Sequence, residues 1–249
     1  MSARPDRAHL FGVPVDVVGP AGALRRATDL YGASVPGRPA LVFTPNPELI
    51  MRCRIEPDLL AVARAPDLAL PDGIGVVWAL RRYGAEVPGR VPGVEFMAQL
   101  LSWAAAEGHP VYFLGGRPEV VAQAVERARA IYPGLSVAGA RDGYFPDKDT
   151  AAVADAVAAS GAHLLFVGMG APVQERFLVA QRSRLGAVRL AMGVGGSLDV
   201  LAGVAQRAPR LVRRVGLEWL WRLMREPSRW RRQLALPRFA WAVLRSPRT

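Results

Sequence analysis

The stretch ALVFTPNPE at residues 40–48 and the stretch LALPDGIG at residues 68–75 decide the fold. Each is an apolar run that ends abruptly in polar residues and turn formers, as a buried parallel strand does at the edge of its sheet. Further apolar runs of this kind lie at 111–114, 135–140, 163–168 and 188–192. The segments between the runs have helical spacing. Strands that alternate with helices predict an α/β fold with a Rossmann-like parallel sheet covered by helices.

The two deciding stretches deliver polar side chains to one edge of this sheet. Thr44 and Asn46 follow the first strand, and Asp72 follows the second. Ligands of open α/β sheets bind just beyond the carboxyl ends of the strands, so Thr44 and Asn46 are predicted to orient a sugar or a nucleotide. Asp72, with Gly73 and Gly75 behind it, is a candidate general base. Asp is also a favoured N-cap residue, and the sequence leaves open whether Asp72 only caps the next helix.

A third strand exit, FLGGRPE, carries Gly116. It resembles a turn whose backbone N–H groups and following helix N-terminus receive a phosphate, and a purely structural turn has the same sequence. The full G-x-G-x-x-G pattern is absent, which weakens the alternative of an NAD(P)-binding oxidoreductase.

Two more strand exits end in glycine-rich turns. GMGAPVQE places Gln174 and Glu175 in the first turn of a helix, where they either reach into the cleft or face solvent beside the helix dipole. GVGGSLDVLAG places Ser197 and Asp199 beside a glycine-lined floor, and either residue is also a plausible helix cap. The sequence keeps both interpretations open for each pair.

Composition bounds the class of protein. The chain has 249 residues, 51% of them hydrophobic, which suits a sizeable core and excludes global disorder. We expect no secretory signal and no membrane span, and therefore a cytoplasmic protein. Cys53 is the only cysteine, the three histidines are far apart in the sequence, and none of the motifs that follow the strands contains a D-x-D. These features predict chemistry that needs no metal and no other cofactor.

The net charge of +11 is concentrated at one end of the chain. Residues 207–249 contain twelve arginines against two glutamates, a net charge of +10, together with four of the six tryptophans. Arginines beside an apolar stripe are typical of a helix that lies in the membrane interface, and a helix docked on the body with its arginines in water has the same pattern. A basic nucleic-acid-binding module is a further alternative, although the near-neutral body argues against it.

The ordered set of motifs resembles the WecG/TagA/CpsF family of bacterial glycosyltransferases, glycosyltransferase family 26. The resemblance covers nearly the whole chain, although Glu95 stands where the family usually has Asp. The matching pieces are TPNPE at 44–48, PDGIGV at 71–76, RVPGVEFM at 90–97, FLGG at 113–116, GAPVQE at 170–175, VGGSLDVLAG at 194–203, and RAP followed by GLEWLWRLMREPSRWRR at 207–232.

This resemblance implies an inverting hexosyltransferase that moves a sugar, N-acetylmannosamine or a related hexose, from a UDP-sugar to an undecaprenyl-diphosphate-linked sugar. The product would enter cell-surface polysaccharide or teichoic acid biosynthesis. The resemblance also implies a catalytic domain at 1–206 and a membrane-associating helical appendage at 207–249. The protein would then be peripheral on the inner face of the cell membrane, at an anionic surface. Whether the protein forms a homo-oligomer stays an open question at this point.

The resemblance also assigns roles to residues. Asp72 would be the base, and Arg90 would face the diphosphate or the sugar. Thr44, Asn46 and Gln174 would line the donor site, and Asp199 would assist nucleotide binding. The turns after the strands add Gly116 and Glu175 to the predicted substrate-binding set. The charge of the tail and the helical spacing of its arginines predict contact with the lipid diphosphate and the membrane for Arg207, Arg222, Arg225, Arg229 and Arg232.

Overall fold

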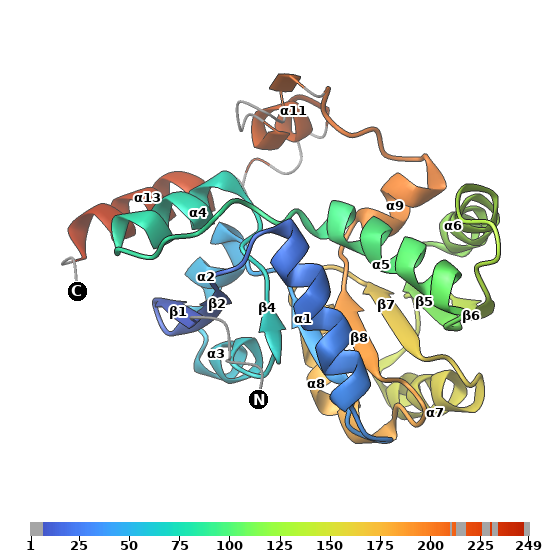
Figure 1. The fold of residues 1–249 in the computed structure, drawn as a ribbon. Coiled ribbons are helices and arrows are strands. Elements are labelled where there is room, and N and C mark those ends of the chain that lie inside the picture. Colours follow the sequence, from blue (N-terminus) through green and yellow to red (C-terminus); the bar gives the residue numbers. More distant parts are fainter. Residues whose placement is uncertain (1–6, 210, 213–217, 226–229, 231–233, 247–249) are drawn as a thin grey trace.

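A six-stranded parallel sheet forms the centre of the molecule (Figure 1). The computed structural model describes residues 7–209, 211–212, 218–225, 230 and 234–246. The strands lie in the order β4-β3-β8-β7-β5-β6. Their bounds are β3 (Ala40–Phe43), β4 (Leu68–Ala69), β5 (Val111–Gly115), β6 (Val137–Arg141), β7 (Leu164–Gly168) and β8 (Leu190–Gly193). The predicted helix-covered parallel sheet is confirmed.

Helices cover both faces of this sheet because successive strand residues point to opposite sides. In β3, Val42 belongs to the core cluster on one face and Leu41 to the cluster on the other. On the Val42 face lie α1 (Pro20–Ala33), α5 (Gly93–Glu107), α6 (Pro118–Ile131) and α9 (Ser197–Ala202). On the Leu41 face lie α7 (Thr150–Ala159) and α8 (Val173–Ala180), with 3₁₀ turns η1 (Asp147–Asp149) and η2 (Arg182–Arg184). Strands β3, β4, β5, β7 and β8 are therefore buried on both sides, whereas the edge strand β6 is only partly covered.

A β-hairpin that the sequence analysis did not predict lies beside β4. It consists of β1 (Arg7–Leu10) and β2 (Val13–Asp16), paired antiparallel. Phe11 and Gly12 form its two-residue loop with φ angles of 51° and 84°, as a tight hairpin turn with two left-handed residues requires. The hairpin shares a hydrophobic cluster with α2 (Pro47–Cys53), α3 (Pro57–Ala63) and α4 (Ile74–Arg82).

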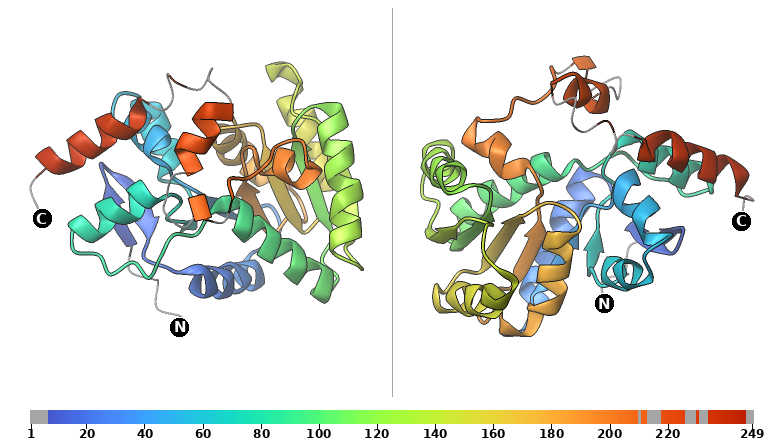
Figure 2. Two further views of the ribbon diagram at one scale, coloured as in Figure 1. Left: turned by 90° about the horizontal axis from the view of Figure 1, so that it is seen from above. Right: turned by 180° about the vertical axis from the view of Figure 1, so that it is seen from behind.

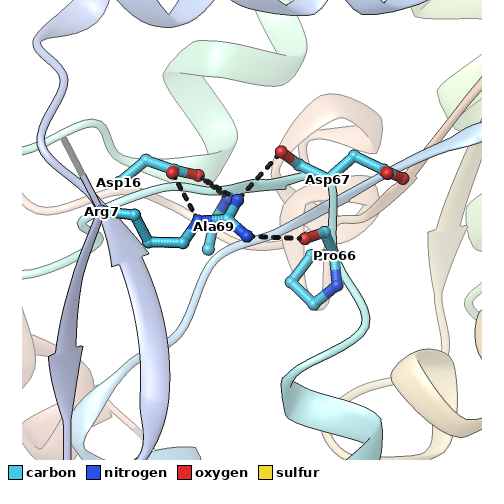
Figure 3. A network of polar contacts seen from close by, with 5 residues as sticks. All are labelled: Arg7, Asp16, Pro66, Asp67 and Ala69. Carbon is cyan, nitrogen blue, oxygen red and sulfur yellow. Dashed lines mark hydrogen bonds and ion pairs between the residues drawn. The ribbon is translucent and has the colours of Figure 1, made fainter. Parts of the chain in front are cut away.

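An ion pair between β1 and β2 also forms hydrogen bonds with the backbone at β4, and these bonds fasten the hairpin to that strand (Figure 3). Both carboxylate oxygens of Asp16 accept hydrogen bonds from Arg7, at 2.7 and 2.8 Å. The same carboxylate accepts the backbone N–H of Ala69 at 2.7 Å. Arg7 also donates to the carbonyl of Asp67 at 2.9 Å. Asp16 is 1% exposed, so it is a buried charge with its partners in place.

The C-terminal region adds α11 (Glu218–Arg225) and α13 (Ala235–Arg245). Helix α13 lies beside α4, and the buried Phe239 and Val243 join the hydrophobic cluster of α2 and α4 (Figures 1 and 2). The inner face of α13 is thus docked on the body, as one of the two interpretations of the tail supposes. The predicted domain boundary between residues 206 and 207 stays a prediction.

Candidate active site

A cavity of about 370 Å³ lies at the carboxyl ends of β3, β4, β7 and β8. The N-terminal ends of α2, α4, α5, α8 and α9 surround it, and residues from α11 and α13 close it. The predicted site residues that line it are Thr44, Asn46, Asp72, Arg90, Gln174 and Glu175. Residues that were assigned from four separate motifs therefore meet at one edge of the sheet, where an α/β fold binds its ligand.

Asp72 lies in the loop between β4 and α4, and it does not cap α4. The N-cap residue is Gly73, whose φ of 88° few other residues adopt, and no side-chain capping bond is present there. The Oδ2 atom of Asp72 instead accepts a long hydrogen bond from the Gly93 N–H, at 3.4 Å. A Cβ on Gly93 would lie 3.2 Å from Thr44 Cγ2 and 3.7 Å from Asp72 Oδ2, so Thr44, Asp72 and the backbone of Gly93 meet at one point.

Asn46 has a structural function in addition to its place at the cavity. It is the N-cap of α2, and its Oδ1 accepts the Leu49 N–H at 2.9 Å. Pro47 follows at the first helical position, which suits a proline because that position needs no N–H donor. The capping bond fixes the side chain, and Nδ2 is the group that Asn46 then presents as a donor.

Gln174 and Glu175 form a buried pair at the start of α8. They are 4% and 3% exposed, so neither is the solvated neighbour that the alternative interpretation supposed. Gln174 donates from Nε2 to Oε1 of Glu175 at 2.8 Å and accepts the Gly195 N–H at 2.9 Å. Burial raises the pKa of Glu175, and its Oε2 has no hydrogen-bond partner within the described chain. The pair holds the glycine-rich turn after β8 against the cavity.

An ion-pair cluster joins the appendage to the site. Arg90 lies 3.7 Å from Glu218, which is the first residue of α11 and also lines the cavity. Arg207 pairs with Glu95 at 2.9 Å and lies 3.9 Å from Glu218. Glu218 was not assigned to the site from the sequence, because it is 128 residues away from its partner Arg90. Two cations near the cavity are therefore held by carboxylates from α5 and α11.

Three predicted residues, Gly116, Asp199 and Arg225, lie outside the set that lines the cavity. Gly116 follows β5, and its N–H and carbonyl bond to Gly168 and Gly143, at 3.1 and 3.0 Å, outside the residues that line the cavity. Asp199 is also outside that lining set, although its Oδ2 would lie 3.5 Å from a Cβ on Gly196, which does line it. Arg225 donates to Gln206 at 2.8 Å.

The remaining tail residues are only partly placed. Arg222 belongs to α11, and Arg229 and Arg232 lie outside the described residues. Their expected contact with a lipid diphosphate stays a prediction, as does that of Arg207 and Arg225.

Cys53 is buried, and burial raises the pKa of its thiol to about 11, so at neutral pH it is a protonated thiol and not a nucleophile. Over the described residues, no group of three or more His, Cys, Asp or Glu side chains is arranged to hold a metal ion. None of the described helices is long and apolar enough to cross a membrane.

A Rossmann-like sheet with a carboxylate, an arginine and amide groups at its carboxyl edge can support a group-transfer reaction. The model of the Glycosyl transferase WecG/TagA/CpsF family matches residues 8–249. The chain belongs to this glycosyltransferase family.

Two curated relatives carry the same description, N-acetylglucosaminyldiphosphoundecaprenol N-acetyl-beta-D-mannosaminyltransferase. The protein of Bacillus spizizenii (strain ATCC 23059 / NRRL B-14472 / W23) is 39% identical over 209 residues, which are 84% of this chain and 80% of the relative. The protein of Bacillus subtilis (strain 168) is 34% identical over 206 residues, which are 83% of this chain and 79% of the relative.

Proposed function

We propose that this protein moves an N-acetylmannosamine-type residue or a related hexose from a UDP-sugar to an undecaprenyl-diphosphate-linked sugar acceptor. The names of the two relatives support the sugar and the lipid-linked N-acetylglucosamine acceptor. The observation that carries the proposal is the meeting of Asp72, Thr44 and the Gly93 amide in a cavity that Arg90 also lines. Membership of a glycosyltransferase family argues against the oxidoreductase and nucleic-acid alternatives.

In the proposed reaction, Asp72 removes the proton from the acceptor hydroxyl. The hydroxyl oxygen attacks the anomeric carbon of the donor from the face opposite the diphosphate, and the bond between that carbon and the diphosphate oxygen breaks. UDP leaves, the anomeric configuration inverts, and the proton stays on Asp72 until it passes to water. A base placed in this way contributes about 10²–10⁴-fold to the rate.

The leaving diphosphate needs donors that receive its developing charge. Among the described residues that line the cavity, Arg90 supplies a cation, and Nδ2 of Asn46 and the backbone N–H of Gly196 are further donors. Gln174 accepts the Gly195 N–H at 2.9 Å, which fixes the turn at Gly195 and Gly196 before the donor binds. Since an arginine and N–H donors receive the charge, the proposed chemistry needs no metal ion.

Replacing Asp72 with Asn tests the base. We expect UDP affinity close to that of the unchanged protein, and a loss of turnover of about 10²–10⁴-fold. The matched control is Asp58→Asn, because Asp58 is an exposed acid on α3. Turnover by Asp72→Asn within a few-fold of the control would remove Asp72 from this role. Activity that EDTA abolishes and Mg²⁺ or Mn²⁺ restores would refute the metal-free chemistry.

We also propose that the basic tail brings the protein to the inner face of the cell membrane, where its arginines contact lipid phosphates. The +10 net charge of residues 207–249 supports this, since each basic residue near an anionic surface contributes about 1 kcal/mol. Neutralising single arginines tests it better than truncation after Gln206. Truncation would also remove Glu218 and Trp219 from the cavity and Phe239 from the core.

A further inference from the structure

A second, open groove lies between α2 and α13, outside the cavity described above. Its volume is about 400 Å³. Three arginines border it: Arg54 follows α2, and Arg238 and Arg245 belong to α13. The other lining residues are Met51, Trp241, Ala242 and Ser246. No acidic residue is among them, so the groove gathers positive charge from two segments that are far apart in the sequence.

Two of the three arginines stack on aromatic rings, a contact that orients the guanidinium group without neutralising it. Arg54 lies 4.7 Å from the ring centroid of Phe11, and Arg245 lies 4.1 Å from that of Trp241. The ion pairs found among the described residues involve other arginines, at positions 7, 52, 90, 176, 182, 184 and 207. An anion in the groove would therefore meet cations whose charge no described carboxylate balances.

Packing holds the two sides of the groove together. Phe239 and Val243 on the inner face of α13 are buried in the cluster that contains Leu49 and Ile50 of α2. Since the hydrophobic contact fixes the spacing of the two helices, the arginines are brought together before any ligand arrives. Guanidinium groups suit bidentate contact with phosphate oxygens, and this arrangement favours a phosphate group as the ligand.

The outer face of α13 indicates what the phosphate is attached to. Trp241 and Leu244 are 58% and 53% exposed, and Leu234 just before the helix is 40% exposed. An exposed tryptophan and leucines beside arginines are typical of a helix that lies in the headgroup region of a bilayer. A free phosphate ion would gain nothing from these apolar side chains, whereas a lipid would cover them.

The groove lies close to the cavity and on helices that lead away from it. Pro47 and Leu49 of α2 line the cavity, as do Ala235 and Leu236 of α13, and both helices continue from there into the groove. At a rise of about 1.5 Å per residue, the nine residues from Leu236 to Arg245 span about 14 Å. A phosphate in the groove would thus place the cavity within about two to three helical turns of the membrane surface.

We propose that the groove formed by Arg54, Arg238 and Arg245 binds the phosphate of an anionic phospholipid, with Trp241 and Leu244 in the headgroup layer. Binding there orients the cavity toward the membrane surface. The inference deepens the proposed membrane role, because a lipid-linked acceptor makes such an orientation useful. It differs from that role in assigning a defined site in which Arg54, a residue of the body, takes part.

Liposome co-sedimentation of the full chain tests the site. The vesicles contain phosphatidylcholine alone, or phosphatidylcholine with about a third phosphatidylglycerol. We expect Arg54→Gln to weaken partitioning onto the anionic vesicles about fivefold, as expected for one basic residue near such a surface. The triple variant R54Q/R238Q/R245Q should lose about a hundredfold. The matched control R25Q/R38Q/R129Q removes the same charge from exposed positions elsewhere, and should lose less than about fivefold.

Three outcomes would overturn the inference. Equal losses for the triple variant and its control would show that only the net charge matters. Partitioning of Arg54→Gln equal to that of the unchanged chain would remove the body from the site. Inorganic phosphate that binds the groove saturably, while vesicle binding stays unchanged in the triple variant, would make it a soluble-phosphate site. Thermal unfolding of all variants within a few degrees of the unchanged chain confirms that they are folded.

Turnover with a short-chain, water-soluble acceptor separates this inference from the proposed function. The triple variant should retain that turnover, because its side chains line no part of the cavity. If the unchanged chain turns over no lipid-diphosphate acceptor while its groove still binds anionic vesicles, the proposed function is wrong and the proposed phospholipid site still stands. If turnover is normal and the groove variants bind vesicles normally, the proposed phospholipid site is wrong and the proposed function still stands.

Discussion

Replacing Asp16 with Ala should destabilise the protein and also disturb the site, because Asp16 joins the β1–β2 hairpin to β4 (Figure 3). The substitution removes the acceptor of the Ala69 N–H, a bond of 2.7 Å, and both acceptors of Arg7. Strand β4 is only two residues long, Leu68–Ala69, and it leads directly to Asp72. Weaker pairing of β4 should therefore also displace Asp72, the candidate base, which lies only three residues after Ala69.

The expected magnitude follows from burial. Leaving a buried N–H without an acceptor costs about 1–3 kcal/mol. Removing one partner of a buried ion pair costs about 3–5 kcal/mol. The Arg7 side chain is 31% exposed and can return partly to water, so the lower end of that range, about 3 kcal/mol, is expected. For a chain of this size, that corresponds to a decrease in Tm of about 6–12 °C.

The assay is thermal and urea unfolding of Asp16→Ala, Asp16→Asn and Asp155→Ala. Asp16→Asn can still accept the Ala69 N–H and should lose about half as much stability. Asp155 pairs with Arg184 at 3.4 Å, and both side chains are more than half exposed, so Asp155→Ala should cost about 0–1 kcal/mol. If Asp16→Ala unfolds within 1 kcal/mol of Asp155→Ala, the buried pair does not hold β4 as argued.

Two further predictions concern titratable groups. Burial raises the pKa of Glu175, so its neutral form is favoured in the folded protein and the stability it contributes is lost as the pH rises through that raised pKa. Glu175→Gln, which can still accept from Gln174, should keep turnover within a few-fold and flatten this loss. Glu175→Ala should lower turnover, and equal turnover for Gln and Ala would contradict the positioning role. Burial lowers the pKa of His109 and of His163, and His163 Nδ1 shares a hydrogen bond of 2.9 Å with the Tyr31 hydroxyl. Since the unfolded chain then binds protons more readily than the folded protein, the free energy of unfolding should fall below about pH 6.5. Tm measured at pH 7.5 and pH 5 should show this fall, and an equal fall in the double variant H109Q/H163Q would refute it.

Much of the sheet and of its active edge is predictable from the sequence, because both depend on local pattern. The runs at 40–48 and 68–75 end where polar residues begin, and Thr44 and Asp72 therefore reach the cavity as expected. The strand within the stretch at 68–75 is short, since only Leu68 and Ala69 pair with β3. The length of a strand depends on how far the neighbouring strand pairs with it, and the sequence of one strand alone does not give that length.

Contacts between distant segments were not predictable from the sequence. Gln174 accepts from Gly195, 21 residues later, and Arg90 pairs with Glu218. Neither pair has a spacing that a helix or a hairpin would produce, so no local pattern indicates it. The β1–β2 hairpin was missed for a different reason. Its Phe11–Gly12 turn lacks the Asn-Gly or Asp-Gly pair that marks most such turns.

The pattern of arginines beside an apolar stripe in the tail allowed two interpretations, a helix docked on the body and a helix in the membrane interface. The structure of α13 is compatible with both. An α-helix turns about 100° per residue, so a helix of eleven residues such as α13 presents distinct faces with independent partners. Phe239 and Val243, four residues apart, are buried against the body. Arg238, Trp241 and Arg245 lie on another face and remain exposed. Docking of the first face uses none of the arginines, and it holds the second face in one orientation relative to the cavity. If α13 contacts the membrane as proposed, its docking is an advantage, because a face that is fixed to the body can orient the whole site.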